Sequence, residues 1–343
     1  MKKTLLALAV LAAAGSVNAA EVFKSDEGSV DFYGQLRPVL TFTDSNDHEA
    51  ELNTSSSRMG VKGVYLLNDS VKLLGEVEVG VAIGANKATK AEGGEKEDDK
   101  VFVRRHIFGI DMGDYGVVRI GKEGTWADDV YFADYSYFFG GFAAETGYGH
   151  AWNNDSQIKY AYTADNFWVK AGYAFGEKDS NEEIREMFVG TTVGDLSLHA
   201  GVMSTDNKIS TSNTDTDTET LSFELTGEYA LGEHTIGLSY YRASKDDNNA
   251  KSTVESDYIT LAGMFAVADK TTLYAGYEYL MEDSDVVGTV DADSSVSYLG
   301  LEYKFSKWAR VFAEVGYTFE GTSFDNKETD DAVDFGLGAR FYW

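Results

Sequence analysis

The chain has 343 residues, and its 57 acidic against 29 basic residues give a formal net charge of -28. This acidic balance excludes a nucleic-acid-binding protein, which needs a basic surface. The 35 glycines, 21 tyrosines and single proline favour many short strands joined by turns over a helical fold.

The amino terminus predicts export. Lys2 and Lys3 precede an apolar run over residues 5–14, and small residues follow up to Ala20, which is the pattern of a secretory signal peptide. We predict residues 1–19 as this peptide, with cleavage after Ala19, and residues 20–343 as the mature chain. Loss of the two lysines would leave 57 acids against 27 bases, a net charge of -30. Because the chain has no cysteine, we expect its stability to come from the sheet itself.

The mature part shows a period of two almost throughout. In a strand, successive side chains point to opposite faces of the sheet. The segment 71–83 keeps its charges on one face, at Lys72, Glu76 and Glu78, while the other face carries valine, leucine or isoleucine at every position except Gly75. A charge on the lipid face near mid-membrane costs roughly 2 to 4 kcal/mol. This separation is therefore expected of a membrane-spanning strand.

The same alternation continues to the carboxy terminus. In the last segment the apolar row is Val333, Phe335, Leu337, Ala339, Phe341 and Trp343, and the facing row is Asp334, Gly336, Gly338, Arg340 and Tyr342. Two segments, 101–112 and 184–193, do not show which face is apolar.

The connections between strands alternate in length. The short ones lie at residues 68–69, 113–116, 165–166, 194–195, 231–233, 269–270 and 306–307. The long polar ones cover residues 44–56, 85–100, 123–154, 177–183, 205–219, 244–256, 282–294 and 320–331. Short turns on one side and long loops on the other are typical of outer-membrane barrels. Counting the strands between them gives sixteen, so we predict an all-β fold, a closed 16-stranded antiparallel transmembrane β-barrel wide enough for an aqueous channel.

The longest connection, residues 123–154, differs from the other loops in composition. It is rich in aromatic residues, among them Trp126, Tyr135, Tyr137, Phe138 and Phe139. Because a loop in water has little use for these side chains, we expect it to fold inward and pack on the barrel wall.

Several motifs together resemble the general diffusion porins of the Gram-negative outer membrane, in particular the vibrio type. They are the segments 30–34 (VDFYG), 57–63 (SRMGVKG), 116–122 and 139–141 (FGG), and the aromatic carboxy terminus. The resemblance covers essentially the whole mature chain. It implies a homotrimer in outer-membrane lipid and lipopolysaccharide that lets ions and small hydrophilic solutes diffuse passively, with no cofactor and no enzymatic activity. It also implies a third loop that bends into the lumen, with its acids facing bases on the wall.

The resemblance and the alternation together give a set of pore-constriction residues. Arg58 and Lys122 fall where the family has wall bases, and Asp134 falls on an acid of the constriction loop. The alternation adds Arg37 and Lys159 as inward-facing bases, and the loop acids Asp128, Asp129 and Glu145 complete the set. Opposed charges across a narrow wet gap bias which ions pass. With few wall bases and an acidic chain, we predict a mild cation preference.

The chain departs from the family pattern at three places. Phe138 stands where many relatives have a loop acid, Gln35 stands where some have a lysine, and residues 152–154 lack an arginine often found after the loop. A substrate-specific channel of the same fold therefore stays open as an alternative, and an outer-membrane adhesin or hydrolase is less favoured. The five histidines lack metal-ligand spacing and no G-x-S-x-G motif is present, so the sequence predicts neither a metal site nor catalytic residues.

Overall fold

The computed structural model describes residues 19–44, 47–54, 57–82, 100–130, 133–141, 153–177, 182–210 and 215–343. Most of the predicted signal peptide and the predicted site residue Glu145 lie outside these residues. The elements are β1 (Ala20–Ser25), β2 (Gly28–Leu36), β3 (Val39–Phe42), β4 (Glu51–Asn53), β5 (Ser57–Leu66), β6 (Lys72–Ala82), β7 (Lys100–Asp111), the 3-10 turn η2 (Gly113–Tyr115), β8 (Val117–Gly124), α2 (Trp126–Asp129), β9 (Asn153–Thr163), β10 (Phe167–Ala174), β11 (Glu183–Val193), β12 (Leu196–Ser210), β13 (Asp215–Leu231), β14 (His234–Asp247), β15 (Ser252–Ala268), β16 (Thr271–Ser284), β17 (Ala292–Ser306), β18 (Ala309–Thr318), β19 (Gly321–Thr322), β20 (Glu328–Thr329) and β21 (Ala332–Tyr342). Within these described ranges, the helices are too short and too polar to span a lipid bilayer.

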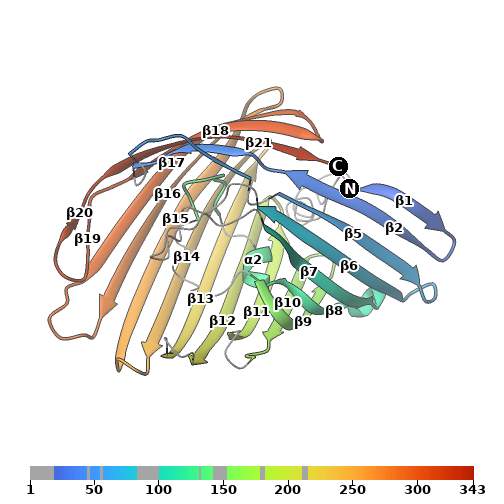
Figure 1. Cartoon of the computed structure of the whole chain (residues 1–343), viewed down its shortest axis with the longest axis horizontal. Coiled ribbons are helices and arrows are strands. Elements are labelled where there is room, and N and C mark those ends of the chain that lie inside the picture. Colours follow the sequence, from blue (N-terminus) through green and yellow to red (C-terminus); the bar gives the residue numbers. More distant parts are fainter. Residues whose placement is uncertain are drawn as a thin grey trace.

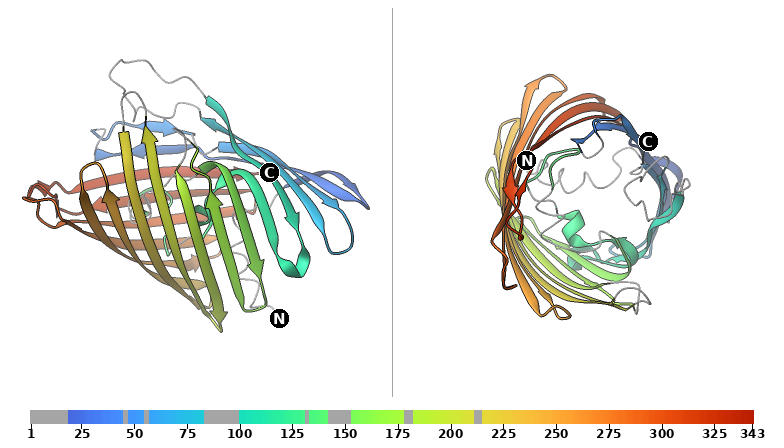
Figure 2. Two further views of the ribbon diagram at one scale, coloured as in Figure 1. Left: turned by 90° about the horizontal axis from the view of Figure 1, so that it is seen from below. Right: turned by 60° about the vertical axis from the view of Figure 1, so that its left-hand side comes forward.

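The strands form one closed antiparallel wall (Figure 1). Each strand from β5 to β18 pairs with the next, β18 pairs with β21, and β21 pairs with β2 and β3. Since β2 and β3 share one position in the wall, and β4 and β5 share the next, the ring has sixteen strands. The right-hand view of Figure 2 looks into this ring, with α2 inside it. The predicted 16-stranded barrel is confirmed.

The wall has an apolar outer face and a polar inner face. On β13 and β14, Phe223 and Leu238 have relative exposures of 49% and 53%, whereas their inward neighbours Glu224, Thr226 and Ser239 are buried. This is the reverse of a water-soluble domain, where the apolar side chains are buried. An apolar outside and a polar inside are what a barrel in lipid requires.

The ring closes at a seam between its first and last strands. Trp343 and Gly34 exchange two backbone hydrogen bonds of 3.0 and 3.1 Å, and Phe341 lies opposite Leu36. Pro38 has no N–H to donate, which explains the break between β2 and β3. Its carbonyl still accepts the N–H of Ala339 at 3.1 Å, so the seam continues past the break.

The structure assigns faces to the two segments that the sequence left open. On β11, Met187 and Val189 are exposed on the outer face, while Ile184 and Phe188 are fully buried on the inner face. Both faces of β11 therefore carry apolar side chains, which obscures the alternation. On β7, the register against β6 shifts beside Val79, where Arg105 pairs with Glu78 and Arg104 is left without a partner across the strands. Because of this irregularity, the side chains of Arg104 and Arg105 both reach Glu78 on the inner face.

Two predicted linkers are wrong. Residues 205–219 and 244–256 lie mostly in strands, because β12 stays paired with β13 up to Ser210 and Asp215, and β14 with β15 up to Asp247 and Ser252. These hairpins extend beyond the apolar band, where both faces of a strand can be polar. The period of two that marks a strand in lipid is therefore lost there.

Candidate functional site

The start of α2 is hydrogen-bonded to the wall. The hydroxyl of Thr125 accepts the N–H of Asp128 at 3.3 Å and caps the helix. The buried carboxylate of Glu186, on the inner face of β11, accepts the N–H groups of Trp126 at 2.6 Å and Ala127 at 3.0 Å. A carboxylate in this position satisfies backbone donors that have no partner within the helix.

The segment 133–141 is hydrogen-bonded to a different part of the wall, on β16 and β18. Glu314 on β18 accepts three consecutive backbone N–H groups, those of Tyr137 at 2.6 Å, Phe138 at 3.1 Å and Phe139 at 2.7 Å. Glu278 on β16 accepts the N–H of Gly141 at 2.7 Å. The described parts of the loop are thus fixed to strands from β11 to β18.

An apolar cluster lies between the loop and the inner wall. Trp126, Ala127 and Val130 of the loop pack with wall side chains that are all buried, namely Ile184, Phe188, Met203, Tyr241, Tyr258 and Leu280. This cluster explains the apolar inner face of β11, since that face contacts the loop instead of water.

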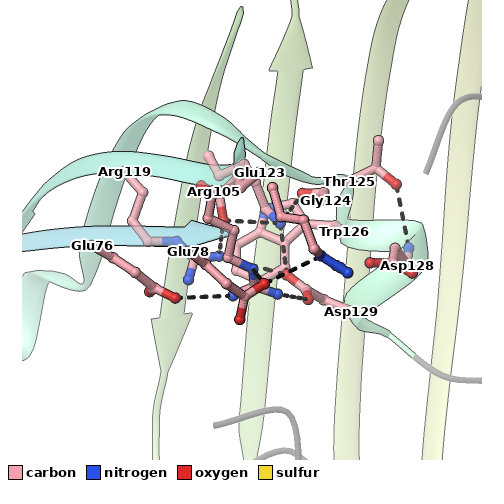
Figure 3. Close-up of polar contacts among 12 residues, drawn as sticks. Glu76, Glu78, Arg105, Arg119, Glu123, Gly124, Thr125, Trp126, Asp128 and Asp129 are labelled. Carbon is pink, nitrogen blue, oxygen red and sulfur yellow. Dashed lines mark hydrogen bonds and ion pairs between the residues drawn. The ribbon is translucent and has the colours of Figure 1, made fainter. Parts of the chain in front are cut away.

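At the end of α2, Asp129 is surrounded by three cations (Figure 3). Its carboxylate lies 2.7 Å from Lys159, 3.6 Å from Arg119 and 3.9 Å from Arg105. Glu123 adds a second carboxylate, 2.7 Å from Arg119 and 3.6 Å from Lys159. The Lys159 ammonium, which is 0% exposed, also donates to the carbonyl oxygen of Gly124 at 2.7 Å. The predicted residues Asp129 and Lys159 are therefore brought together, as an ion pair that fastens the loop to the wall.

The two adjacent aspartates of α2 have opposite pKa shifts. Burial alone would raise the pKa of Asp129, but Lys159, Arg105 and Arg119 together lower it. Burial, followed by the charge of neighbouring Asp129, raises the pKa of Asp128 to about 6. In the described part of the chain no cation forms an ion pair with Asp128. Asp128 is thus the acid of α2 that titrates near neutral pH.

Arg37 and Arg58 lie on the inner face of the wall. Arg37 alternates with the exposed Leu36, and Arg58 alternates with the exposed Met59. Both residues are half-buried, and Arg58 is close enough to Asp128 for electrostatic attraction. An acid on the loop therefore faces a base on the wall, Arg58.

Comparison with known proteins agrees with this geometry. A family model described as Gram-negative porin matches residues 5–323. The chain belongs to the Gram-negative porin family. The porin is 25% identical to porin-like protein H of Photobacterium profundum, over 92% of this chain and 94% of the relative. Among solved structures it resembles a loop L8 deletion mutant of OmpT, an outer membrane protein of Vibrio cholerae, with 43% identity, a TM-score of 0.80 and coverage of 93% and 100%. It also resembles OmpT of Vibrio cholerae in its trimer form, with 41% identity, a TM-score of 0.77 and coverage of 93% and 100%.

Family membership and the closed barrel establish the general function. The porin is an outer-membrane channel through which small solutes diffuse. The family and the names of the relatives point to a channel rather than an enzyme. Among the described residues, no three His, Cys, Asp or Glu side chains are grouped so as to hold a metal ion.

Two predicted site residues of the porin lie apart from the cluster around Asp129. Lys122 forms an ion pair with the exposed Asp155. Asp134 is only 7% exposed, and its oxygens accept the backbone N–H and the hydroxyl of Ser136 at 2.9 and 3.0 Å. Burial raises the pKa of Asp134. The carboxylate of Asp134 therefore takes part in a turn within the loop.

Sequence reasoning missed several groups that hold the loop of the porin, namely Arg105, Arg119, Glu123, Glu186, Glu278 and Glu314. Alternation could have found Glu314, which is a single charge between Ala313 and Val315, and Arg119, which stands before the exposed Ile120. Glu186 and Arg105 lie in the two segments whose facing could not be predicted, so alternation offered no signal for them.

Proposed function

We propose that the channel is a general diffusion pore narrowed by the loop residues 125–130 and 133–141. The observation that carries this proposal is the set of hydrogen bonds from the loop backbone to buried wall carboxylates, from Glu186 on β11 to Glu314 on β18. A loop held on the inner face of a sixteen-stranded barrel reduces the cross-section of the water-filled lumen.

In this proposal the constriction residues divide by role. Asp128 faces the solute from the loop, and Arg37 and Arg58 face it from the wall. Asp129 and Lys159 fix the loop through their 2.7 Å ion pair. Asp134 stabilises a turn within the loop through its hydrogen bonds to Ser136. Lys122 is not assigned to the constriction, because it forms its ion pair with the exposed Asp155. Glu145 lies outside the described residues and stays a prediction.

We further propose a mild cation preference. The chain carries 57 acidic against 29 basic residues. Several acids, among them Glu78, Glu224, Glu228, Glu278 and Glu302, lie on the inner face of the wall. Fixed negative charges along a pore raise the local concentration of cations.

The assembly and processing of the chain belong to the same proposal. The trimer form of the Vibrio cholerae relative supports a homotrimer, and the apolar outer face fits contact with lipid and lipopolysaccharide. The lysines and apolar run at the amino terminus support a signal peptide over residues 1–19, removed after Ala19.

Liposome swelling and planar-bilayer recording test the proposal together. Sugars of increasing size should enter liposomes at steadily falling rates, and each insertion event should add conductance in three equal steps. Saturable block by one sugar or nucleoside would instead favour a substrate-specific channel. Liposomes that stay impermeable to small sugars would refute the pore.

A further inference from the structure

The outer face of the wall carries a hollow toward the short-turn end of β1, β2, β5, β6 and β7, which lie side by side in Figure 1. One row of outward residues crosses these five strands, and the register pairs each residue of the row with the next: Phe23, Val30, Gly63, Gly75 and Phe108. Two paired glycines thus stand in the middle of the row, with bulkier side chains on both sides. We name this feature the glycine hollow.

The two glycines leave room for a ligand. Among the described residues, no heavy atom would lie within 4 Å of a Cβ at Gly63 or Gly75. By contrast, a Cβ at Gly60, on the inner face of the same strand, would lie 2.6 Å from the ring of Tyr33. The hollow encloses about 470 Å³, which falls within the range of about 300–1,000 Å³ that is typical of small-molecule sites.

The walls of the hollow belong to the apolar band of the barrel. Phe23, Tyr65 and Phe108 line the hollow and are all exposed on the outer face. In an outer-membrane barrel, this band contacts lipid. Lipid chains are as apolar as leucine, so packing decides what binds there. A flexible chain that enters the hollow gains dispersion contacts on its floor and on both sides.

Acidic side chains stand at the short-turn edge of the glycine hollow. Glu27 lines the hollow and follows Asp26 in the β1–β2 turn. The carbonyl oxygen of Glu27 accepts the N–H of Leu66 at 2.7 Å, which brings this turn beside the β5–β6 turn with Asp69. Within the described ranges, none of these three acids forms an ion pair, since the lysines of β1 and β6 pair with other acids. The edge is therefore negative and suits a ligand with a cationic end.

A second copy of the chain fits this acidic edge less well than a lipid does. Copies in one membrane are related by rotation about the membrane normal, so their short turns meet at the same height. The following short turns each carry an acid as well, namely Asp114, Asp165, Asp195, Glu233 and Asp269. A neighbouring copy would place acids against acids, which is unfavourable. A lipid headgroup that ends in an ammonium group brings the opposite charge.

We propose that the glycine hollow binds one acyl chain of a zwitterionic phospholipid from the leaflet at the short-turn side. The chain packs over Gly63 and Gly75, between the rings of Phe23 and Phe108. The ammonium group of the headgroup lies beside Glu27, and the apolar hollow and the acidic edge thus hold the two ends of one molecule. The site lies on the outer face and does not depend on the proposed pore.

The test uses the full-length protein in detergent with a trace of phosphatidylethanolamine that carries a photoreactive diazirine in one acyl chain. Illumination should label Phe23, Tyr65 or Phe108, as located by mass spectrometry of peptides, and the labelling should saturate. Unlabelled phosphatidylethanolamine should compete better than phosphatidylglycerol, whose headgroup has no cation. Gly63→Leu/Gly75→Leu fills the hollow and should lower the labelling about tenfold or more.

Two variants separate the chain from the headgroup and control for added bulk. Ala313→Leu enlarges a side chain elsewhere on the outer face, between the buried Phe312 and Glu314, and should be labelled like wild type. Glu27→Gln should keep the labelling but lose the advantage of phosphatidylethanolamine over phosphatidylglycerol. Equal labelling of wild type and Gly63→Leu/Gly75→Leu overturns the acyl-chain site. Equal competition by the two lipids in wild type overturns the role of the acidic edge.

A second experiment identifies the occupant in the cell membrane. The photoreactive residue p-benzoylphenylalanine takes the place of Tyr65, and the cells are illuminated before purification. A protein whose mass has increased by one phospholipid is the expected result, whereas a covalent dimer shows that a second copy fills the hollow and overturns the lipid site. Wild-type KCl conductance confirms that each variant is folded, and the single variant Gly63→Leu replaces the double one if the latter does not fold.

Discussion

At the scale of single residues, Asp128 is the group most suited to make selectivity depend on pH. Its pKa is raised to about 6 by burial and by Asp129, against the opposing effects of Lys159, Arg105 and Arg104. The carboxyl group is therefore charged above that pH and neutral below it. As the pH falls from about 8 to about 5, the cation preference of the wild-type channel should fall, with a midpoint near 6. Reversal potentials in a KCl gradient measure this change.

The Asp128→Asn variant should start with a weaker cation preference and change little over the same pH range. Asp325→Asn removes one acid from a distant exposed loop and should behave like wild type. If Asp128→Asn keeps the full pH dependence, another group carries the titration.

Glu186 has a different effect, because it positions the loop without facing the solute. Glutamine at this position offers one carbonyl oxygen where two backbone N–H groups now donate to two carboxylate oxygens. One buried donor would lose its partner, at a cost of about 1–3 kcal/mol. Glu186→Gln should lower the denaturant midpoint and increase the current noise of the open channel. Glu183→Gln on the same strand removes a partly exposed acid that pairs with Arg185, and both readouts should then stay at the wild-type level.

At the scale of elements, alternation predicts the strands whose two faces differ and fails where they do not. Alternation predicts β13 correctly because Phe223 and Leu225 face outward while Ser222 and Glu224 face inward. It fails at β11, because the inner face of that strand packs under Trp126. Alternation also fails at the hairpin ends of β12 and β13, for the opposite reason. Both faces of the strands contact water there, so both can be polar.

The same reasoning separates the site residues. Alternation with exposed neighbours is enough to predict that Arg37 and Lys159 point inward, because each strand fixes the direction of its own side chains. It does not predict that Asp129 meets Lys159, or that Glu314 accepts three N–H groups from the loop. Those contacts depend on the path of the loop through space, and no local pattern encodes that path.

The seam between the first and last strands gives a matched pair of glycine substitutions. A Cβ at Gly34 would fall within the indole ring of Trp343, whereas a Cβ at Gly63 meets nothing within 4 Å. Gly34→Ala should therefore displace Trp343 and weaken the closure, while Gly63→Ala should stabilise its strand by roughly 0.5–1 kcal/mol through lower backbone entropy in the unfolded chain. Urea unfolding in detergent should shift the midpoint in opposite directions, and equal shifts would contradict this role of the seam.

At the scale of the whole molecule, the barrel reverses the usual distribution of polarity. Apolar side chains on the outer face remain exposed, while acids such as Glu278 are fully buried within the lumen. Averaging over both faces gives a mean hydropathy of -0.28, which hides the membrane-spanning character of the chain. The closed ring also satisfies the backbone donors and acceptors that lipid cannot hydrate. Long-range strand pairing thus provides both the fold and the wet interior.

The acidic charge of the whole molecule makes a final prediction about salt. Fixed charges act on passing ions over the Debye length, which is about 10 Å in 0.1 M salt and about 3 Å in 1 M salt. The cation preference should therefore be largest in dilute KCl and should fall toward the ratio of the free-ion mobilities in concentrated KCl. Reversal potentials at a constant tenfold gradient and increasing mean concentration measure this trend. A cation preference that does not change with salt would mean that selectivity arises from direct contact between the ion and one narrow site. A preference for anions in dilute KCl would refute the proposed role of the lumen acids.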